Sequence, residues 1–271
     1  MGIMQPWLGY MPPFRIWGNL YFVGTEPAST HIVDTGDGLV MLDSGYQHSV
    51  YLVLQNMHTL GLNPMNLKYI LHTHGHIDHC GATRALVEMT GAKTFLGQPD
   101  RDYVNGKVDL SWAKELGLQL ETFEPDVLLH DNDVITLGNT NIKAIATPGH
   151  TPGAMSYLFN VHCGSRTLTA GLHGGAGTNS MTREFLDHYS LPYSCRADFL
   201  SAMDRLKTLK VDIYLGNHAY QNQTAEKYQQ LIKGNKDAFV DSAAWSDFAE
   251  NCKNRLYALI AKEDAHHIET I

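Results

Sequence analysis

A cluster of four histidines and one aspartate constrains this chain more than any other feature of its sequence. It occupies eight consecutive residues, His72-Thr73-His74-Gly75-His76-Ile77-Asp78-His79. A short apolar run at 67–71 precedes it and predicts a strand, and apolar residues spaced for a helix follow it at 81–89. Loops at the carboxyl ends of strands host ligands in layered α/β folds. We therefore expect a strand, a metal-binding loop and a helix; a histidine-rich surface loop without metal is the alternative.

The spacing inside the cluster provides ligands for two metal ions side by side. In a turn, His74 and His76 can point into one cavity, while Asp78 and His79 can face a neighbouring point. Imidazole and carboxylate ligands suit a borderline cation such as Zn²⁺, and open coordination positions leave room for water. We expect His72 to lie behind the ligands or simply to be buried.

Two further histidines occur in the same kind of position. His150 lies in a Pro/Gly-rich loop at 147–153 and His218 lies just past 211–215, and each follows a predicted strand. Either histidine alone is as readily a surface-loop residue as a ligand. Three predicted strands that each end in histidines favour one shared site.

The order of the predicted elements indicates an α/β fold with a layered sheet. Alternating apolar residues predict three strands, at 20–24, 30–34 and 38–43, joined by turn sequences into an antiparallel meander. No Ser/Gly-rich linker or charge run divides the chain, so we expect one domain over residues 1–271, made of two similar halves with central strands and outer helices. The other expected elements are helices at 49–60, 81–89, 198–209 and 241–261, and strands at 67–71, 142–146, 155–160, 167–171 and 211–215.

Charge and hydropathy narrow the class of partner. Lys plus Arg number 20 and Asp plus Glu number 28, so the net charge is −8, whereas proteins that bind nucleic-acid backbones normally carry a basic excess. No apolar run approaches the roughly 18–20 residues of a membrane helix. We expect a small-molecule substrate, with neither nucleic acid nor membrane as partner, and the oligomeric state stays open. We expect a periplasmic or secreted protein if a leader has been removed, and a cytoplasmic protein otherwise.

The four cysteines do not form a recognisable framework. They are too few and too irregularly spaced for a disulfide scaffold or a CxxC zinc site, although one or two bridges are compatible with their number. These residues are Cys80, Cys163, Cys195 and Cys252.

The cluster also contains a motif. His74-Gly75-His76-Ile77-Asp78-His79 reads HxHxDH and resembles the hallmark of the metallo-β-lactamase-fold hydrolases. The resemblance extends over nearly the whole chain to the class B metallo-β-lactamases of subclass B3. It includes the stretches at 12–25, 146–153 and 239–241.

This resemblance implies an αββα sandwich with a dinuclear zinc site at one edge, two Zn²⁺ per chain. A hydroxide that bridges the ions would be the nucleophile, in agreement with the pKa of about 7 that zinc gives to bound water, and Asp78 would also orient it. Carried over position by position, His74, His76 and His150 would hold the first zinc, and Asp78, His79 and His218 the second.

Asp43 resembles the carboxylate that lies beneath the site in this family. There it would fix the tautomer of a ligand histidine. A turn or helix-capping aspartate before Ser44-Gly45 is an equally good interpretation.

The chain departs from the pattern of many superfamily hydrolases at one position. Glyoxalase II and its relatives place a metal-bridging aspartate after the strand that follows the third-histidine loop, and the other zinc β-lactamase subclasses place a cysteine near there. Here the segment reads Thr169-Ala170-Gly171-Leu172-His173-Gly174-Gly175, and Cys163 comes too early. The third subclass lacks both residues, so the departure favours B3.

The same segment carries the predicted substrate contacts. His173 is an extra ligand, a substrate contact or a residue without a role in binding. Thr178, Asn179 and Ser180 are candidate hydrogen-bond donors to a substrate, in a loop of the kind that often carries binding residues.

The leading hypothesis is a zinc-dependent hydrolase that opens the amide of a β-lactam ring. One alternative on the same fold hydrolyses another cyclic or activated acyl compound, such as a lactone or thioester, because fold does not fix substrate. A metal-binding protein without hydrolytic activity is the alternative from another class.

Overall fold

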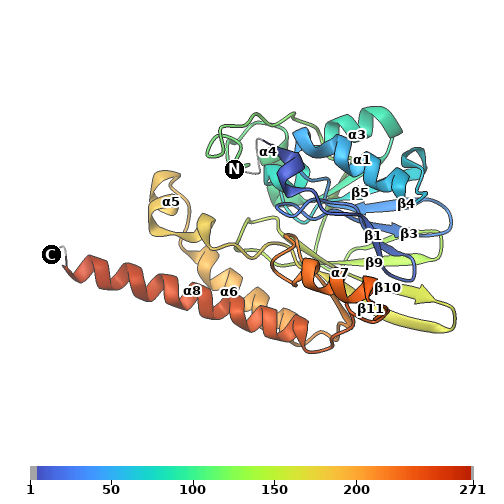
Figure 1. Ribbon diagram of the computed structural model, residues 1–271. Helices are drawn as coiled ribbons and strands as arrows, with labels where there is room; N and C mark the ends of the chain where they lie inside the picture. The colour runs from blue at the N-terminus through green and yellow to red at the C-terminus, as the bar shows by residue number, and fades with distance from the viewer. Residues whose placement is uncertain (1–4, 270–271) are drawn as a thin grey trace.

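Two β-sheets stacked face to face form the centre of the structure, a computed structural model that describes residues 5–269 (Figure 1). The first sheet has seven strands in the order β1 to β7, and the second has five in the order β12-β11-β10-β9-β8. The first contains β1 Phe14–Trp17, β2 Leu20–Phe22, β3 His31–Asp34, β4 Leu39–Leu42, β5 Leu67–Leu71, β6 Lys93–Gly97 and β7 Val127–Leu129. The second contains β8 Val134–Leu137, β9 Thr140–Ala146, β10 Met155–Cys163, β11 Arg166–Leu172 and β12 Ile213–Leu215.

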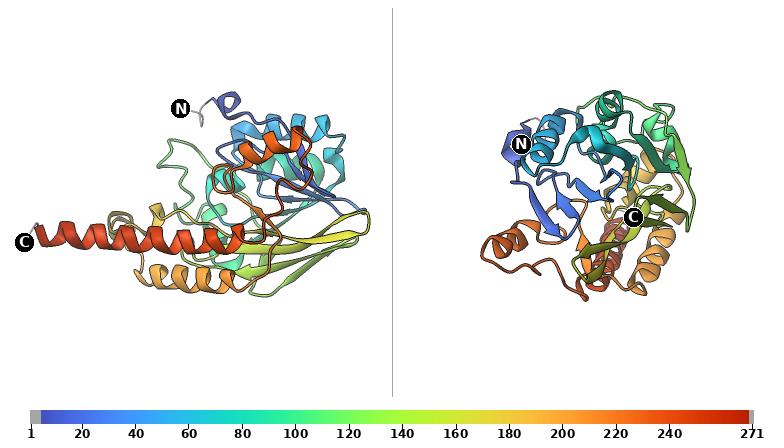
Figure 2. Two further views of the ribbon diagram at one scale, coloured as in Figure 1. Left: turned by 60° about the horizontal axis from the view of Figure 1, so that its bottom comes forward. Right: turned by 90° about the vertical axis from the view of Figure 1, so that its right-hand side faces the viewer.

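Helices cover the outer faces of both sheets. Their bounds are α1 Val50–Thr59, α2 Ile77–Cys80, α3 Thr83–Thr90, α4 Arg101–Val104, α5 Arg183–His188, α6 Ser194–Lys207, α7 Thr224–Ile232 and α8 Ala244–Glu269. Helices α1 and α3 lie over the first sheet and α6 and α8 over the second, which gives the four layers visible in Figures 1 and 2. The predicted αββα sandwich is confirmed.

The first sheet changes direction at β4. The meander β2-β3-β4 is antiparallel, as predicted, whereas β4-β5-β6-β7 pair in parallel. Parallel strands need crossover connections, which α1 and α3 provide. Every residue of β4 is buried, as expected for a strand covered on both faces. The parallel strands therefore deliver the segments that follow β4, β5 and β6 to one edge of the sandwich.

The second sheet is longer than the sequence indicated. Strands β10 and β11 continue to Cys163 and Arg166, which pair directly, so a two-residue turn joins them. Gly164 in that turn has φ +59°, the conformation such hairpins require. The predicted strand ends at 160 and 167 were wrong because the turn is shorter than the sequence suggested.

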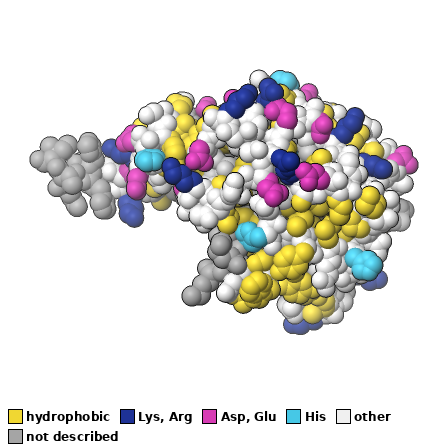
Figure 3. All heavy atoms as spheres, turned by 90° about the horizontal axis from the view of Figure 1, so that it is seen from above, with side chains coloured by type: hydrophobic (Ala, Val, Ile, Leu, Met, Phe, Trp, Pro, Cys, Tyr) yellow, Lys and Arg dark blue, Asp and Glu magenta, His cyan; other side chains and the backbone are white. Residues whose placement is uncertain are grey.

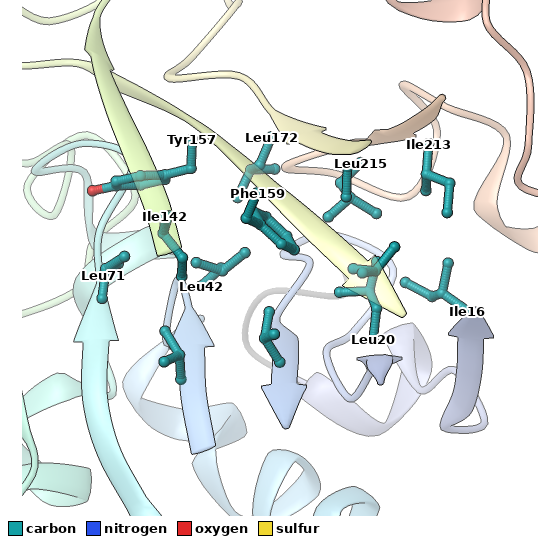
Figure 4. Close-up of a cluster of buried hydrophobic side chains, with 14 of the residues drawn as sticks. Ile16, Leu20, Leu42, Leu71, Ile142, Tyr157, Phe159, Leu172, Ile213 and Leu215 are labelled. Carbon is teal, nitrogen blue, oxygen red and sulfur yellow. The ribbon is translucent and has the colours of Figure 1, made fainter. Parts of the chain in front are cut away.

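The main core fills the space between the two sheets (Figure 4). Leu20, Leu42 and Leu71 project from the first sheet toward Phe159 and Leu172 of the second. Two further clusters pack each sheet against its outer helices. Burial on both faces explains why a chain with so much apolar strand sequence forms layers rather than an open sheet.

Several elements were not predicted from the sequence, among them β1, β6, β7, β8, α5 and α7. The last helix begins at Ala244 rather than at 241, because the Asp241 carboxylate accepts a hydrogen bond from the Ala243 N–H at 3.1 Å and holds a turn there. All four cysteines are free, so the bridges that their number allowed do not form.

Charged side chains of both signs are mixed on the surface. On the face seen in Figure 3, basic side chains are interspersed with acidic ones rather than gathered in a stripe. Among the described residues, no helix is both long and apolar enough to cross a membrane.

Candidate metal centre

The histidine cluster forms a loop at the edge of the sandwich, directly after β5. The Tyr157 hydroxyl of the second sheet donates a hydrogen bond to the His72 carbonyl oxygen at 2.7 Å. The Met155 backbone N–H donates to the Thr73 carbonyl oxygen, also at 2.7 Å. The second sheet thus holds the loop of the first sheet in place.

Three histidines converge on one position. Ligand atoms of His74, His76 and His150 all lie within 4.8 Å of one another, and Nε2 of His74 is 3.1 Å from Nδ1 of His76. Two ligands of one tetrahedral zinc ion, each about 2.0–2.1 Å from the metal, lie roughly 3.3 Å apart. All three side chains are buried. The donor set therefore fits a three-histidine zinc position.

A second position adjoins the first. Oδ2 of Asp78 lies 3.1 Å from Nε2 of His79 and 3.7 Å from Nε2 of His218. Ligand atoms of His74, Asp78 and His79 also lie within 4.8 Å of one another, so His74 is close to both positions. The six side chains predicted as ligands line one cavity of about 310 Å³.

Hydrogen bonds to carbonyl oxygens determine which ring nitrogen is free. Nδ1 of His150 donates to the Gly177 carbonyl at 2.8 Å, and Nδ1 of His218 donates to the Pro27 carbonyl at 2.6 Å. A carbonyl oxygen only accepts, so Nδ1 carries the proton and Nε2 offers its lone pair. Outer hydrogen bonds of this kind orient metal-binding imidazoles.

Asp43 is buried beneath the loop and joins three segments. Its carboxylate accepts hydrogen bonds from the backbone N–H and the hydroxyl of Thr73 at 2.7 and 2.8 Å, and from Nδ1 of His79 at 2.8 Å. The Asn217 side chain donates to it at 3.4 Å. Asp43 therefore turns Nε2 of His79 toward the cavity.

Burial and charge set the protonation of the metal-free site. Burial, reinforced by neighbouring histidines, holds the pKa of His74 and His76 well below the usual range, and burial lowers the pKa of His150 to about 4. Burial also disfavours protonation of His79, but the two adjacent carboxylates outweigh it and raise its pKa to about 10. Asp78 keeps a lowered pKa despite burial because His79 stabilises its charge. A metal that binds here must displace the proton of His79.

Asp100 joins two of the ligand loops, and the sequence analysis did not identify it. Its buried carboxylate accepts hydrogen bonds from the Gly75 N–H at 2.9 Å, the Gly153 N–H at 2.6 Å and the Thr151 hydroxyl at 2.6 Å. Burial raises its pKa to about 6 against these three bonds. A Cβ at Gly153 would lie 2.5–2.7 Å from Asp100 atoms, so only glycine fits there. The available signal was its place shortly after β6, a strand that the sequence did not reveal.

His72 faces away from the cavity. Its Nδ1 hydrogen-bonds the Phe95 carbonyl at 2.9 Å, and its Nε2 hydrogen-bonds the Thr83 hydroxyl at 2.7 Å. It ties the ligand loop to β6 and α3.

His173 is fully buried outside the cavity. Its ring stacks on Phe248 with 4.5 Å between centroids, its Nε2 donates to Oε1 of Gln221 at 3.0 Å, and its Nδ1 accepts from the Gly175 N–H at 3.2 Å. The same Oε1 accepts from the His218 N–H at 3.1 Å. His173 thus supports the loop that carries His218, and it has no exposed surface for a substrate or free ring nitrogen for a metal.

Of the three predicted hydrogen-bond donors to substrate, only Asn179 lines the metal cavity, where it is exposed. Thr178 is half-buried and does not belong to the lining. Ser180 is buried, and its hydroxyl donates to the His150 carbonyl at 2.6 Å. Trp112, which the sequence analysis did not select, forms another part of the cavity wall.

A family model decides where this arrangement belongs. The model of the Metallo-beta-lactamase superfamily matches residues 23–162, more than half of the chain. The chain belongs to the metallo-β-lactamase superfamily. The match contains the ligand loop and His150, while His218 lies beyond it.

Solved structures of metallo-β-lactamases share the whole fold. The native FEZ-1 metallo-β-lactamase from Legionella gormanii superposes with a TM-score of 0.86 and 27% identity, over 94% of this chain and 97% of that one. BJP-1, a subclass B3 metallo-β-lactamase of Bradyrhizobium japonicum, gives a TM-score of 0.84 over 97% of this chain and 98% of that one, at 24% identity. The predicted similarity to subclass B3 is confirmed for the fold.

Curated relatives of this metallo-β-lactamase-fold chain include other hydrolases. The hydroxyacylglutathione hydrolase GloC of Haemophilus influenzae is 28% identical over 60% of this chain and 74% of its own length. The chain spans 39% of an uncharacterized protein of Aquifex aeolicus, at 37% identity, and 61% of YobT of Bacillus subtilis, at 27%. The chain thus spans less than two thirds of the length of each of these last two relatives.

Proposed function

We propose that the chain hydrolyses the amide bond of β-lactam rings with two zinc ions. The observation that carries this proposal is the composition of the cavity, in which Asp78 is the one carboxylate among the described lining residues. Many other hydrolases of the superfamily add a bridging aspartate after the strand that corresponds to β11. Here β11 ends at Leu172, and the next residue, His173, is buried away from the cavity.

The donor atoms suit zinc at both positions. His74, His76 and His150 would hold one ion, and Asp78, His79 and His218 the other, a set of neutral imidazoles and one carboxylate. Bound zinc would supply an activated water nucleophile and polarise the scissile carbonyl.

The residues of the chain supply orientation and proton handling. Asp78 would accept a hydrogen bond from the attacking water and hold it toward the substrate. The exposed amide of Asn179 can donate a hydrogen bond to the substrate at the rim of the cavity. The Trp112 ring centroid lies 6.1 Å from that of His76, so an aromatic ring forms that side of the cavity wall.

A second candidate function is the hydrolysis of a lactone or thioester. The similarity to GloC, a hydroxyacylglutathione hydrolase, favours it. The same cavity and the same water chemistry would serve a thioester carbonyl, so substrate recognition alone separates the two candidates.

Metal analysis and a substrate panel test the proposal. We expect close to two zinc ions per chain and chelator-sensitive turnover of a penicillin, a cephalosporin or a carbapenem. The lactone and thioester in the panel should be turned over more slowly. Chelator-sensitive turnover of the thioester alone would overturn the proposal in favour of the second candidate.

A pair of histidine variants tests the ligand assignment. His150→Ala should lower the zinc content and abolish turnover, because it removes one of three ligands of a position. The matched control is His130→Ala, since the His130 side chain is exposed and lies 3.8 Å from the Asp133 carboxylate, outside the lining of the metal cavity. Unchanged zinc content in His150→Ala would disprove the assignment.

A further inference from the structure

The last helix of the chain reaches a segment that borders the metal cavity. Helix α8 packs along α6, and its last turns pass beside α5 (Figure 1). Glu263, near the end of α8, forms an ion pair at 2.6 Å with Arg196 in the first turn of α6. The Glu263 side chain is only 14% exposed and that of Arg196 only 10%. Both charges are thus largely withdrawn from water, and each depends on the other as its partner.

This ion pair holds the backbone at two points. Nε of Arg196 donates a hydrogen bond to the Met181 carbonyl oxygen at 2.8 Å. Oε1 of Glu263 accepts a hydrogen bond from the Arg183 N–H at 2.7 Å. The two backbone groups lie on either side of Thr182, so a single ion pair fixes the chain before and after one residue.

The backbone held in this way belongs to a turn at the rim of the metal cavity. Residues Asn179–Met181 form one turn of 3₁₀ helix, and the Met181 N–H donates to the Thr178 carbonyl at 3.0 Å. Asn179, at the start of the turn, lines the metal cavity. The far end of the turn is therefore held by α6 and α8, while its start faces the metal cavity.

Two other carboxylates of α8 lie in water and serve for comparison. Glu250 pairs with Lys207 of α6, and its side chain is 44% exposed. Asp264 pairs with the Arg183 guanidinium at 3.0 Å, and its side chain is 62% exposed. Exposed ion pairs contribute little to the stability of a fold. Glu263 differs from both by its burial and by its hydrogen bond to the backbone.

We propose that Arg196 and Glu263 are positioning residues for the substrate, because they fix this turn and so hold the Asn179 amide at the rim of the metal cavity. The part that concerns substrate rests on the proposed function, whereas the fixing of the turn does not. Hydrogen bonds to charged groups are stronger than neutral ones, which suits them to this task. A displacement of about 1 Å that begins far from the reacting atoms can lower activity substantially.

Glu263→Gln tests the effect on substrate binding in the zinc-loaded enzyme. Glutamine keeps the shape of the side chain, but its amide accepts from one of the two donors and turns its own NH₂ group toward the other. We expect KM for benzylpenicillin to rise by about 3–10-fold, the effect of losing one hydrogen bond to the substrate. The kcat should stay within about twofold of wild type, because this contact binds substrate and transition state alike.

Glu250→Gln is the matched control, since it makes the same change on the same helix at an exposed ion pair. It should leave KM at the wild-type value. Wild-type KM in Glu263→Gln as well would overturn the proposal.

Arg196→Lys tests the same contact with the buried charges kept in balance. Lysine retains a positive charge for Glu263, but its ammonium group lacks the fork of donors with which a guanidinium serves Glu263 and the Met181 carbonyl together. We expect the same rise in KM as in Glu263→Gln. A folded Arg196→Lys variant with wild-type KM would contradict the proposal even if Glu263→Gln failed to fold.

A double-mutant cycle shows whether Glu263 acts through Asn179. Asn179→Ala removes the amide that the turn presents, so Glu263→Gln should add little to the KM of that variant. Contacts that act in series give such non-additive effects. Fully additive effects on KM would mean that Glu263 acts by another route, and would overturn the positioning role.

Hydrogen exchange tests the fixing of the turn without turnover. Peptides that cover residues 177–183 of the zinc-loaded protein should exchange several-fold faster in Glu263→Gln than in the wild type, because local opening becomes easier. The same peptides should exchange at the wild-type rate in Glu250→Gln. Wild-type exchange in Glu263→Gln would overturn the proposal.

The two kinds of measurement separate the two proposals. Faster exchange at 177–183 without any β-lactam turnover would keep the fixing of the turn and overturn the proposed β-lactam substrate. β-Lactam turnover with unchanged KM and unchanged exchange in Glu263→Gln would overturn the positioning residues alone.

Discussion

The two halves of the molecule hold their candidate ligands in different ways. The first half supplies four of the six from one short segment, the loop after β5 and the helix α2 that follows it, and side chains such as Asp43 and Thr73 fix their orientation. The second half supplies His150 and His218 from two separate loops, and main-chain carbonyls fix both rings. One half therefore depends on charged anchors and the other on the path of the backbone.

This difference indicates which ligands a single substitution can most easily misorient. A side-chain anchor can be removed by one substitution, and its charge also sets the pKa of the ligand that it touches. A carbonyl anchor survives any substitution of its own side chain as long as the loop keeps its shape. We therefore expect variants of the first half to lose more metal and more activity than equivalent variants of the second half.

The largest effect should come from His74→Ala. His74 lies close to both candidate metal positions, whereas His150 belongs to one of the two candidate groups. We expect His74→Ala to retain almost no zinc and His150→Ala to retain about one ion, as measured by elemental mass spectrometry on purified protein. The activity loss in both should exceed the roughly 10–100-fold effect of losing an outer partner. Equal zinc content in the two variants would show that the first-half ligand His74 contributes no more to metal binding than the second-half ligand His150.

Asp100→Asn tests the contact that joins the two halves. An amide keeps one acceptor oxygen, which can still accept from the Gly75 N–H and the Thr151 hydroxyl, but its NH₂ group then faces the Gly153 N–H, so at least one buried hydrogen bond is lost and two donors are placed against each other. We expect the free energy of unfolding to fall by about 2–4 kcal/mol, measured by urea denaturation.

Asp102→Asn is the matched control for Asp100→Asn. Asp102 is half-buried, accepts a hydrogen bond from the Asn105 side chain at 3.2 Å and pairs with Lys107 at 3.6 Å, an ion pair worth about 0–1 kcal/mol. If the two variants were equally stable, Asp100 would not hold the ligand loops together.

Asp43→Asn removes a charged anchor while it preserves the backbone. Asp43 has φ +56°, a conformation that Asn also tolerates, so the effect reports the lost carboxylate. We expect zinc affinity to fall by about 10–100-fold, measured by competition with a chelating dye. Wild-type zinc affinity would show that the Asp43 carboxylate is not needed to hold His79 in place.

The stability of the metal-free protein should depend on pH through the pairing of His79 with Asp43. The pKa of His79 is raised from 6.5 to about 10 in the folded state by Asp78 and Asp43, against the effect of burial. A raised pKa stabilises the fold below pH 6.5, and this stabilisation is lost as the pH rises through 10. The melting temperature of the wild type should thus exceed that of Asp43→Asn at pH 7, and the gap should narrow toward pH 10. A difference in melting temperature that stays constant between pH 7 and pH 10 would contradict the ion pairing of His79 with Asp43.

The same contrast explains what the sequence could predict. The first-half ligands are contiguous and follow an apolar strand, so local pattern alone located them and the layered fold around them. His150 and His218 were identified by their position after strands, which is weaker evidence. The sequence did not identify Asp100 and Trp112, because they act through contacts with distant loops. No periodic pattern marks the segments that carry them. His173 was a candidate because it lies close in sequence to the predicted substrate contacts. Its side chain instead turns into the core and packs on Phe248.

The smallest effect should follow from Ser180→Ala, in the second half. The Ser180 hydroxyl donates to the His150 carbonyl and lies 3.2 Å from its Nδ1, but the Gly177 carbonyl still accepts the Nδ1 proton when the hydroxyl is gone. We expect a stability loss of about 1 kcal/mol, the usual contribution of one hydrogen bond, and zinc affinity within about threefold of wild type, well short of the 10–100-fold cost of an essential outer partner. The same dye competition used for Asp43→Asn measures both variants. A loss of zinc affinity as large as that of Asp43→Asn would mean that the backbone alone does not hold His150, and that the two halves depend on side-chain anchors to the same degree.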